Sequence, residues 1–352
     1  MDRRAFLVTT TAAAATTAVA ADGAAAREQK VNGPAVIRGL QQLTYSSPWT
    51  ADVPVFGDMA ADLKNRLQTA LGDRYSIIQQ ADQATESDLV FSPAEAIAPS
   101  VEGLAFFSGL PGTLGLLPYA HQAWLIAGGG QMLWDDLSSP HGWKPLLAGH
   151  TGSSPGLWTN RALHSVEDLA NTTITVSGIG GRVADNLSAT VVELSPGELV
   201  PALGSNRISA SEWGNPLAAL MLGLPTAATH YYHEGISRTG TALALNVRLR
   251  VWNDLGASDR AIIEGVTAAA FSLSVAQFSA HRHFAIEAAK RSHPSLIVAH
   301  LPASLSQAVD DAARKAVMDM SSASADAARI RHSYEAFSAL FAHSEAQAAA
   351  IS

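Results

Sequence analysis

The stretch TTITVSGIGGRV, Thr172–Val183, joins a short run of β-branched residues to a glycine turn and the first residues of a helix. Thr and Ile favour extended backbone, and the glycines mark the turn that follows. The stretch also resembles a G-x-G-x-x-G dinucleotide loop, but Val183 stands where the third glycine belongs, which favours a plain helix-start turn. Together with similar alternations on both sides, it predicts an α/β protein with largely parallel sheets.

The flanking sequence supplies more strands and helices. Apolar residues recur every three to four positions between residues 55 and 71, which predicts an amphipathic helix, and residues 119–137 predict a helix interrupted by glycines. GLAFFSGLPGTLGLLP, residues 103–118, is apolar but broken by Gly and Pro, so we expect a strand and a loop there. Nearly all of residues 259–351 is helical in period, with breaks near Pro294 and Pro302.

Composition bounds the class of protein. The chain has 352 residues, of which 47% are hydrophobic and 15% charged, and this suits a globular protein of about two domains. Its net charge of -8 and the lack of clustered Lys and Arg exclude a nucleic-acid partner. The chain has no cysteine, which excludes disulfides and thiol chemistry.

The first residues have the pattern of an export signal. Arg3 and Arg4 precede Phe6, Leu7 and a weakly apolar Ala/Thr run that ends in small residues. This pattern predicts a twin-arginine signal peptide over residues 1–26 and a periplasmic mature protein. No other window reads as a transmembrane helix, so we expect a soluble mature chain.

Two motifs invite enzymatic or metal-binding interpretations. GSSPG, residues 152–156, matches the G-x-S-x-G pattern with Ser154 as nucleophile, and an exported serine hydrolase is the alternative function. Pro155 lacks the N–H that the oxyanion hole needs from this position. The HYYH and HRHF pairs lack the spacing and acidic partners of a zinc site.

RISASEWGNP, Arg207–Pro216, places Glu212 beside Trp213. Glu is usually solvated and Trp is usually buried. The wall of a ligand pocket explains the pairing, and so does a surface turn next to a core Trp.

Taken in order, several stretches resemble the extracytoplasmic solute-binding proteins of TRAP transporters, in particular the branch that binds 2-oxo acids and other monocarboxylates. They run from about Gly103 to Leu255 and are GLAFFSGLP, AWLIAGGGQMLWDDL, GWKPLLAGHTG, GLWTNRAL, SVEDL, GIGGRV, GELVPALGSNRISASEWGNP, YYHEG and VWNDL.

The resemblance implies a two-lobed periplasmic-binding-protein-like fold (type II) with a ligand cleft between the lobes. We assign residues 33–150 and 242–295 to lobe I, residues 151–241 to lobe II, and residues 296–352 to C-terminal helices that pack on the lobes. It further implies a non-enzymatic protein that captures a small organic anion and delivers it to TRAP permease subunits in the membrane. A sensor or scaffold with altered ligand remains a second alternative, and a homodimer remains open.

Site residues follow from the resemblance. In relatives the segment matching SEWGNP lines the cleft, so Glu212 and Trp213 are expected beside the ligand and a bound cation, with sodium or calcium as the candidate ion. Thr175 stands where relatives carry an Arg that binds the substrate carboxylate, and Ser154 stands where they carry a Gln. These two changes imply either a different ligand or another source of positive charge.

Two arginines are candidates for that charge. Arg161 in TNRAL matches a second family Arg, and Arg238 follows YYHEG near a position where relatives hold the cation. A surface position explains either Arg equally simply. Phe107 and Tyr232 are candidate apolar walls of the cleft, with core packing as their alternative role.

Overall fold

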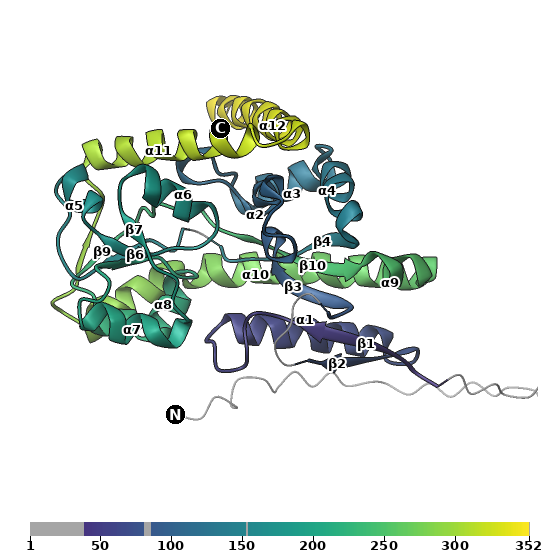
Figure 1. Cartoon of the computed structure of the whole chain (residues 1–352). Helices are drawn as coiled ribbons and strands as arrows, with labels where there is room; N and C mark the ends of the chain where they lie inside the picture. Colours follow the sequence, from purple (N-terminus) through teal and green to yellow (C-terminus); the bar gives the residue numbers. More distant parts are fainter. Residues whose placement is uncertain (1–38, 81–85, 153, 352) are drawn as a thin grey trace, which may run out of the picture. The chain divides into compact units, whose positions relative to one another are not determined.

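A five-stranded sheet forms the first half of the fold. The computed structural model describes residues 39–80, 86–152 and 154–351, so the predicted export signal lies outside the described residues. The strand order is β2–β1–β3–β10–β4 (Figure 1), and the strands are β1 (Gln41–Ser46), β2 (Tyr75–Gln79), β3 (Leu89–Pro93), β4 (Trp143–His150) and β10 (Ala242–Arg248). Every residue of β10 but its last is buried, as expected for a strand paired on both edges.

A six-stranded sheet forms the second half. Its order is β11–β9–β5–β8–β6–β7, and its strands are β5 (Leu157–Thr159), β6 (Thr173–Thr175), β7 (Thr190–Val191), β8 (Ala210–Ser211), β9 (His230–Tyr232) and β11 (Ile297–Ala299). The deciding stretch forms β6 and the helix after it, as predicted. Both sheets carry helices on their faces, which confirms the α/β class.

The sheets are mixed, which corrects the expectation of largely parallel sheets. β10 runs antiparallel to both β3 and β4, and β5 runs antiparallel to β8 and β9. The reason is topological: the chain passes from the first sheet to the second after β4 and returns after β9. A β-helix-β unit makes its two strands parallel. A strand that the chain forms on returning from another sheet is not under this constraint and can pair antiparallel.

Twelve α-helices are described. They are α1 (Phe56–Leu71), α2 (Ala105–Ser108), α3 (Pro118–Ile126), α4 (Gly130–Ser138), α5 (Val166–Ala170), α6 (Ile179–Asn186), α7 (Pro196–Gly204), α8 (Pro216–Leu222), α9 (Leu249–Asp254), α10 (Ala257–Ser292), α11 (Ala303–Ser321) and α12 (Ala325–Ile351). Short 3-10 turns are η1 (Ala94–Ile97), η2 (Glu102–Leu104), η3 (Gly112–Leu114), η4 (Ser139–His141) and η5 (Leu224–Thr226). The predicted helix over residues 55–71 is therefore confirmed, and the predicted glycine break separates α3 from α4 at Gly129, whose φ is +84°.

α10 connects the two sheets. It packs on β4 and α1 of the first sheet and on α8 beside the second (Figure 1). Its length and composition would also allow it to cross a membrane, which sequence inspection did not anticipate. Its contacts with three other elements are those of a helix packed within a folded protein.

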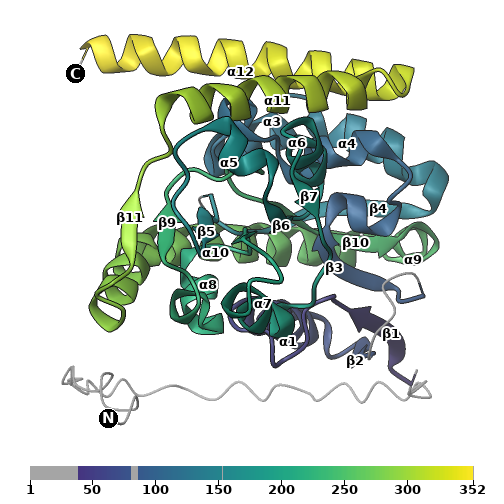
Figure 2. The same cartoon turned by 60° about the vertical axis from the view of Figure 1, so that its left-hand side comes forward.

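The last two helices cover one side of the fold. α11 packs on α6 and α5, α12 packs on α3 and α4, and the two run side by side (Figure 2). The buried hydroxyl oxygen of Tyr334 in α12 accepts a hydrogen bond from the Leu116 N–H at 2.7 Å. The C-terminal helices are therefore fixed to the segment that precedes α3.

Residues 103–118 differ from expectation. Instead of a strand and loop they form η2, α2 and η3, and α2 ends at Gly109, whose φ of +112° suits glycine. Phe107 lies fully buried between Trp124 and Trp134, with ring centroids 5.5 and 5.1 Å away and nearly parallel planes. A helical turn buries both phenylalanines of this segment, which a half-exposed strand would not do. Phe107 therefore packs in the core, which was the alternative to its predicted role as a wall of the ligand cleft.

We predict that Phe107→Ala lowers the free energy of unfolding by about 3–5 kcal/mol, because it leaves a cavity between two indole rings. Urea unfolding followed by circular dichroism measures the change. Solute affinity of the folded variant should remain that of the parent protein. A loss of affinity with unchanged stability would contradict this core role and support the predicted ligand contact.

Candidate functional site

Several of the predicted site residues lie where the chain passes between the sheets. Thr175 ends β6, Glu212 follows β8, and Ser154 lies in the segment that links β4 to β5. Arg238 lies in the segment that links β9 back to β10. Loops at strand ends and crossings are the usual place for ligand sites in such sheets.

Glu212 anchors the returning segment. Its side chain is buried, and its two carboxylate oxygens accept hydrogen bonds from the N–H groups of Ile236 and Ser237 and from the Ser237 hydroxyl. Its own N–H donates to the carbonyl of Thr175 at 2.9 Å. Burial raises the Glu212 pKa to about 7, although these three hydrogen bonds act in the opposite direction. The carboxylate therefore fastens segment 236–237 to the ends of β6 and β8.

Trp213, which follows β8 of the second sheet, contacts a helix of the first sheet. Its ring is half-buried and meets the ring of Phe56 edge to face at 5.5 Å, and Phe56 begins α1 of the first sheet. Gly214 has φ +63°, and a Cβ there would lie 2.5 Å from Phe56, so the close contact requires glycine. Glu212 and Trp213 are thus adjacent because one holds a buried segment and the other packs across the gap.

Asn215 and Pro216 complete the motif by starting α8. The Asn215 side chain accepts the Ala218 N–H at 2.9 Å as an N-cap, and it donates to the Thr151 carbonyl at 2.9 Å. Pro216 occupies the first helical position, where its missing N–H costs nothing. The motif therefore both holds segment 236–237 and starts α8.

Arg238 brings a buried positive charge to the turn after β6. Its side chain is 4% exposed, its Nε donates to the Gly109 carbonyl at 2.8 Å, and its Nη2 lies 2.5 Å from Oε1 of Glu95. The guanidinium lies against Gly178, where an added Cβ would come within 2.6 Å of Nη1. Gly178 has φ +57° and stands three residues after Thr175. A positive charge therefore sits beside the turn from which the family Arg is missing, although it comes from a different segment.

Sequence reasoning missed Glu95 and Ser108. Glu95 lies in η1, directly after β3, and its second oxygen accepts the hydroxyl hydrogen of Ser108. The Ser108 hydroxyl oxygen in turn accepts the Ala94 N–H at 2.8 Å. The signal was a carboxylate two residues beyond the end of β3, which is a position where ligand-binding residues commonly lie.

Two buried histidines lie nearby: the charge of Arg238 acts on His121, and His121 acts on His150. Burial lowers the pKa of His121 to about 4, with a smaller effect from Arg238, and lowers that of His150 to about 3. His150 Nδ1 accepts the Gly152 N–H at 2.9 Å, which requires the neutral ring. Both histidines are therefore neutral at pH 7 and add no charge to the site.

The hydroxyls at the two positions that depart from the family have local partners. Ser154 is partly buried, its Oγ accepts the Gly156 N–H at 3.2 Å, and it lies beside Gly235 next to Glu212. Thr175 donates to the Val192 carbonyl at 3.1 Å. Among the described contacts no histidine hydrogen-bonds Ser154, so the hydrolase alternative gains no general base from the structure.

Two predicted residues lie apart from this group. Arg161 is exposed and donates to the Asp168 carbonyl at 2.7 Å and to Thr172 at 3.1 Å. Tyr232 is buried, and its hydroxyl oxygen accepts the Leu163 N–H at 2.8 Å. Arg161 thus has the surface position that was its alternative, and the Tyr232 hydroxyl is engaged within its own sheet.

The donors around Glu212 bear on a bound cation. Within the described residues no three Asp, Glu or His side chains gather as a metal site. Both Glu212 oxygens face N–H or O–H donors, whose positive ends would repel a sodium or calcium ion placed between them. In this conformation the residues present do not fit a cation at Glu212, and we derive no step through one.

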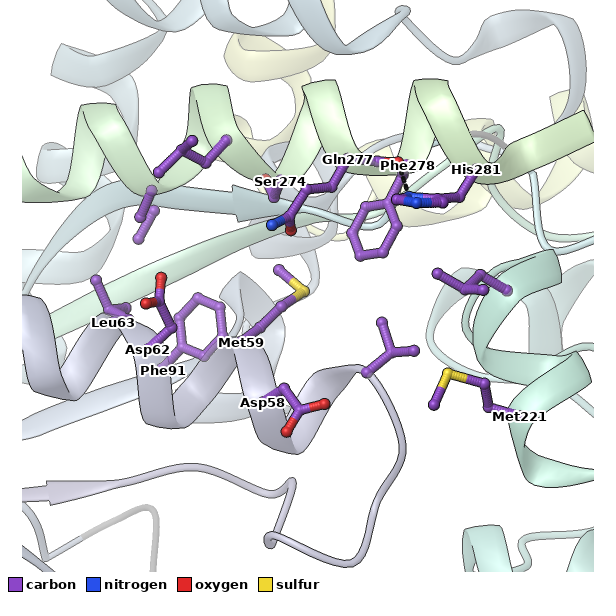
Figure 3. Close-up of a pocket in the computed structure, with 15 residues that line it drawn as sticks. Asp58, Met59, Asp62, Leu63, Phe91, Met221, Ser274, Gln277, Phe278 and His281 are labelled. Atoms are coloured by element: carbon purple, nitrogen blue, oxygen red, sulfur yellow. Dashed lines mark hydrogen bonds between the residues drawn. The ribbon is translucent and has the colours of Figure 1, made fainter. Parts of the chain in front are cut away.

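A separate cavity of about 410 Å³ lies between α1, α8 and α10 (Figure 3). Its walls are mostly apolar, with Met59 on α1, Met221 on α8 and Phe278 on α10. Asp58 of α1, which is exposed, also borders the cavity. None of the predicted site residues lines this cavity, but its walls belong to helices that pack beside different sheets.

Two sheets joined by crossing segments are the architecture of a two-lobed solute-binding protein. The chain belongs to family 7 of the bacterial extracellular solute-binding proteins, the DctP family, whose sequence pattern matches residues 118–322. The family resemblance seen in the sequence is thereby confirmed, and the family is extracytoplasmic.

Individual relatives agree. The monocarboxylate 2-oxoacid-binding periplasmic protein of Nostoc sp. is 33% identical over 177 residues, and the match spans half of this chain and 48% of that relative. One solved structure is a TRAP periplasmic solute-binding protein of Pseudoalteromonas atlantica with bound sodium and pyruvate. It superposes with a TM-score of 0.80 at 21% sequence identity, and the match covers 89% of this chain and 98% of that chain. One from Colwellia psychrerythraea, solved with calcium and pyruvate, has a TM-score of 0.80 at 22% identity, with coverages of 87% and 96%. These structures confirm the predicted fold.

We predict that His150→Gln reduces the acid sensitivity of the fold. A histidine whose pKa is lower in the folded than in the unfolded state stabilises less as the pH falls below 6.5, because the unfolded chain takes the proton first. Between pH 6.5 and 5 each such histidine contributes a slope of up to about 1.4 kcal/mol per pH unit.

The measurement is urea unfolding of wild type and variant at several pH values, which gives the slope of the unfolding free energy against pH. Glu212 contributes the opposite slope to both proteins, because its raised pKa lowers stability as the pH rises above 4.5, so the difference between them isolates His150. Equal slopes for the two proteins would contradict the buried neutral state of His150.

Proposed function

We propose that this chain is the extracytoplasmic solute-binding subunit of a TRAP-type secondary transporter. It captures a small monocarboxylate between lobe I (residues 33–150 and 242–295) and lobe II (residues 151–241) and delivers it to a membrane permease. Family membership supports the binding role, and the names of the Nostoc, Pseudoalteromonas and Colwellia relatives support the ligand class. We further propose a periplasmic location reached through a twin-arginine signal.

The observation that carries the proposal is the buried Arg238. A guanidinium that is 4% exposed at the crossing between two sheets is costly unless it is paired, and its forked donors match a carboxylate. Its place beside Gly178 supplies the positive charge that Thr175 lacks. We therefore assign to Arg238 the carboxylate-binding role that relatives give to the residue matching Thr175.

The proposal includes no catalytic role. Ser154 has no histidine partner among the described contacts, and its successor Pro155 cannot donate to an oxyanion. Closure of the lobes over the solute is then the functional event, since it buries the solute and forms the surface that a permease recognises.

We predict that Arg238→Ala weakens monocarboxylate binding by at least about 30-fold, because loss of a buried charged partner costs 2 kcal/mol or more. Arg238→Lys keeps the charge but loses the fork, so its loss should be smaller. Isothermal titration calorimetry measures both, with thermal unfolding as the test of folding.

Arg161→Ala is the matched control, since it removes an exposed Arg of the same family pattern. If this control lost affinity while both Arg238 variants bound normally, the assignment of the carboxylate site would be wrong.

We also predict that solute binding shifts the methyl NMR signals of Met59 and Met221 in protein labelled with ¹³C-methyl methionine. These methionines lie on opposite walls of the cavity between α1 and α8, and closure changes the distance between those walls. Met318 and Met320 of α11 lie outside the cavity and serve as internal controls. Uniform small shifts at all four positions would argue against lobe closure.

A further inference from the structure

The cavity between α1, α8 and α10 is large enough for a small ligand (Figure 3). Its volume of about 410 Å³ lies within the range of small-molecule sites, roughly 300–1,000 Å³. The helix α1 packs beside the first sheet and α8 beside the second, and α10 contacts both of these helices. A ligand in this cavity would therefore touch three elements that lie far apart in the sequence.

Most of the cavity lining is apolar. Met59 points from α1 toward α10, and Phe278 points from α10 toward α1 (Figure 3). Met221 of α8 and Leu273 of α10 also line the cavity, with 57% and 40% of their surfaces exposed. Methionine side chains adapt to ligands of different shapes and make favourable contacts with aromatic rings. The apolar part of a ligand would cover this exposed surface and gain from its burial.

The backbone is strained at the edge of the cavity. Val55, which lines the cavity, is the centre of a γ-turn with φ +71° and ψ −54°, in which the Phe56 N–H donates to the Pro54 carbonyl at 2.8 Å. A γ-turn of this hand is rare, and a positive φ is an outlier for a β-branched residue. Strain of this kind is concentrated at ligand-binding sites. Here it fixes the start of α1 and with it the positions of Asp58 and Met59.

The charged residues of the cavity are acidic. Asp58 and Asp62 lie one turn apart on α1, and among the described lining residues none is Lys or Arg. Asp62 is paired with Arg66 at 2.6 Å, whereas no partner for the Asp58 side chain is among the described contacts. Arg282 of α10 lines an adjoining hollow but not this cavity. The charge that the lining offers to a ligand is therefore negative.

We propose that this cavity is a second ligand site, which binds a small organic cation with an apolar chain. The chain lies between Met59, Met221 and Phe278, and the ammonium group lies beside Asp58. An exposed carboxylate attracts an ammonium group only modestly, so burial of the chain supplies most of the affinity and Asp58 supplies the preference for a cation. The inference goes beyond the proposed function, because it involves neither Arg238 nor a carboxylate.

Three probes of equal chain length test the ligand class. Octylammonium, 1-octanol and octane-1-sulfonate carry a positive, a neutral and a negative head group on the same chain. Calorimetric titration of the full mature protein at pH 7 should show that octylammonium binds about three- to fivefold more tightly than 1-octanol, as an exposed ion pair allows. Octane-1-sulfonate should bind more weakly than 1-octanol.

Methyl NMR tests the location. In protein labelled with ¹³C-methyl methionine, protons of the octyl chain should show nuclear Overhauser effects to the methyl groups of Met59 and Met221. Met132 of α4 is 70% exposed but lies outside the cavity, so it is the control for non-specific binding of an apolar chain. Effects at Met132 as strong as those at Met59 would overturn the proposed site.

Variants separate the charge from the space. Asp58→Asn keeps the shape of the side chain, and it should reduce the preference for octylammonium over 1-octanol to below about twofold. Asp254→Asn is the matched control, because it removes the same charge from an exposed position in α9, outside the cavity. Ala270→Phe fills the cavity from α10 and should abolish binding of all three probes, with thermal unfolding as the test of folding.

Three other results would overturn the inference. Equal affinity for octylammonium and 1-octanol would overturn the cationic class, even with contacts at Met59 and Met221. Absence of binding by the folded wild type would overturn the site. Methyl shifts of Met59 and Met221 that grow with protein concentration, without any probe, would show that a second copy of this chain covers the cavity instead. None of these results tests the proposed function, which depends on monocarboxylate binding and on the Arg238 variants.

Discussion

The contact between the Arg238 guanidinium and the Glu95 carboxylate is the interaction on which the site depends. Arg238 belongs to the segment that returns from the second sheet, whereas Glu95 follows β3 of the first sheet. Removing one partner of such a buried pair typically costs 3–5 kcal/mol, because the other charge remains without compensation. The pair thereby holds the segment between β9 and β10 next to η1 and fixes the position of the Arg238 guanidinium.

Two further contacts hold the same region. Glu212 fastens segment 236–237 to the ends of β6 and β8, and Trp213 packs against Phe56 across the gap between the sheets. Adjacent residues of one short motif therefore perform a polar and an apolar task. The sequence could not decide between a pocket wall and a turn beside a core Trp. The structure shows a buried Glu212 that holds segment 236–237 and a half-buried Trp213 that packs on Phe56, and the role of pocket wall stays a prediction.

Much of the fold was predictable, because its signals are local. The periodicity of residues 55–71, the glycine break before α4 and the strand-turn-helix of residues 172–183 all depend on neighbours in sequence. The direction of β10 was not predictable in this way, because it depends on where the chain returns to the first sheet. The prediction of a strand and loop around Phe107 was wrong for a similar reason. The burial of Phe107 depends on Trp124 and Trp134 rather than on local Gly and Pro content.

The candidate site divides in the same manner. Glu212, Trp213 and Arg238 were predicted from the family resemblance, and their binding roles stay predictions. Glu95 was missed because its partner lies 143 residues away and no pattern in the sequence joins them. The most direct measurement is a crystal structure of the mature protein with the solute that copurifies from the periplasm, identified by mass spectrometry. Our account predicts a small carboxylate within hydrogen-bonding distance of the Arg238 guanidinium. A solute bound elsewhere, such as in the cavity between α1 and α8, with the Arg238–Glu95 contact unchanged, would contradict it.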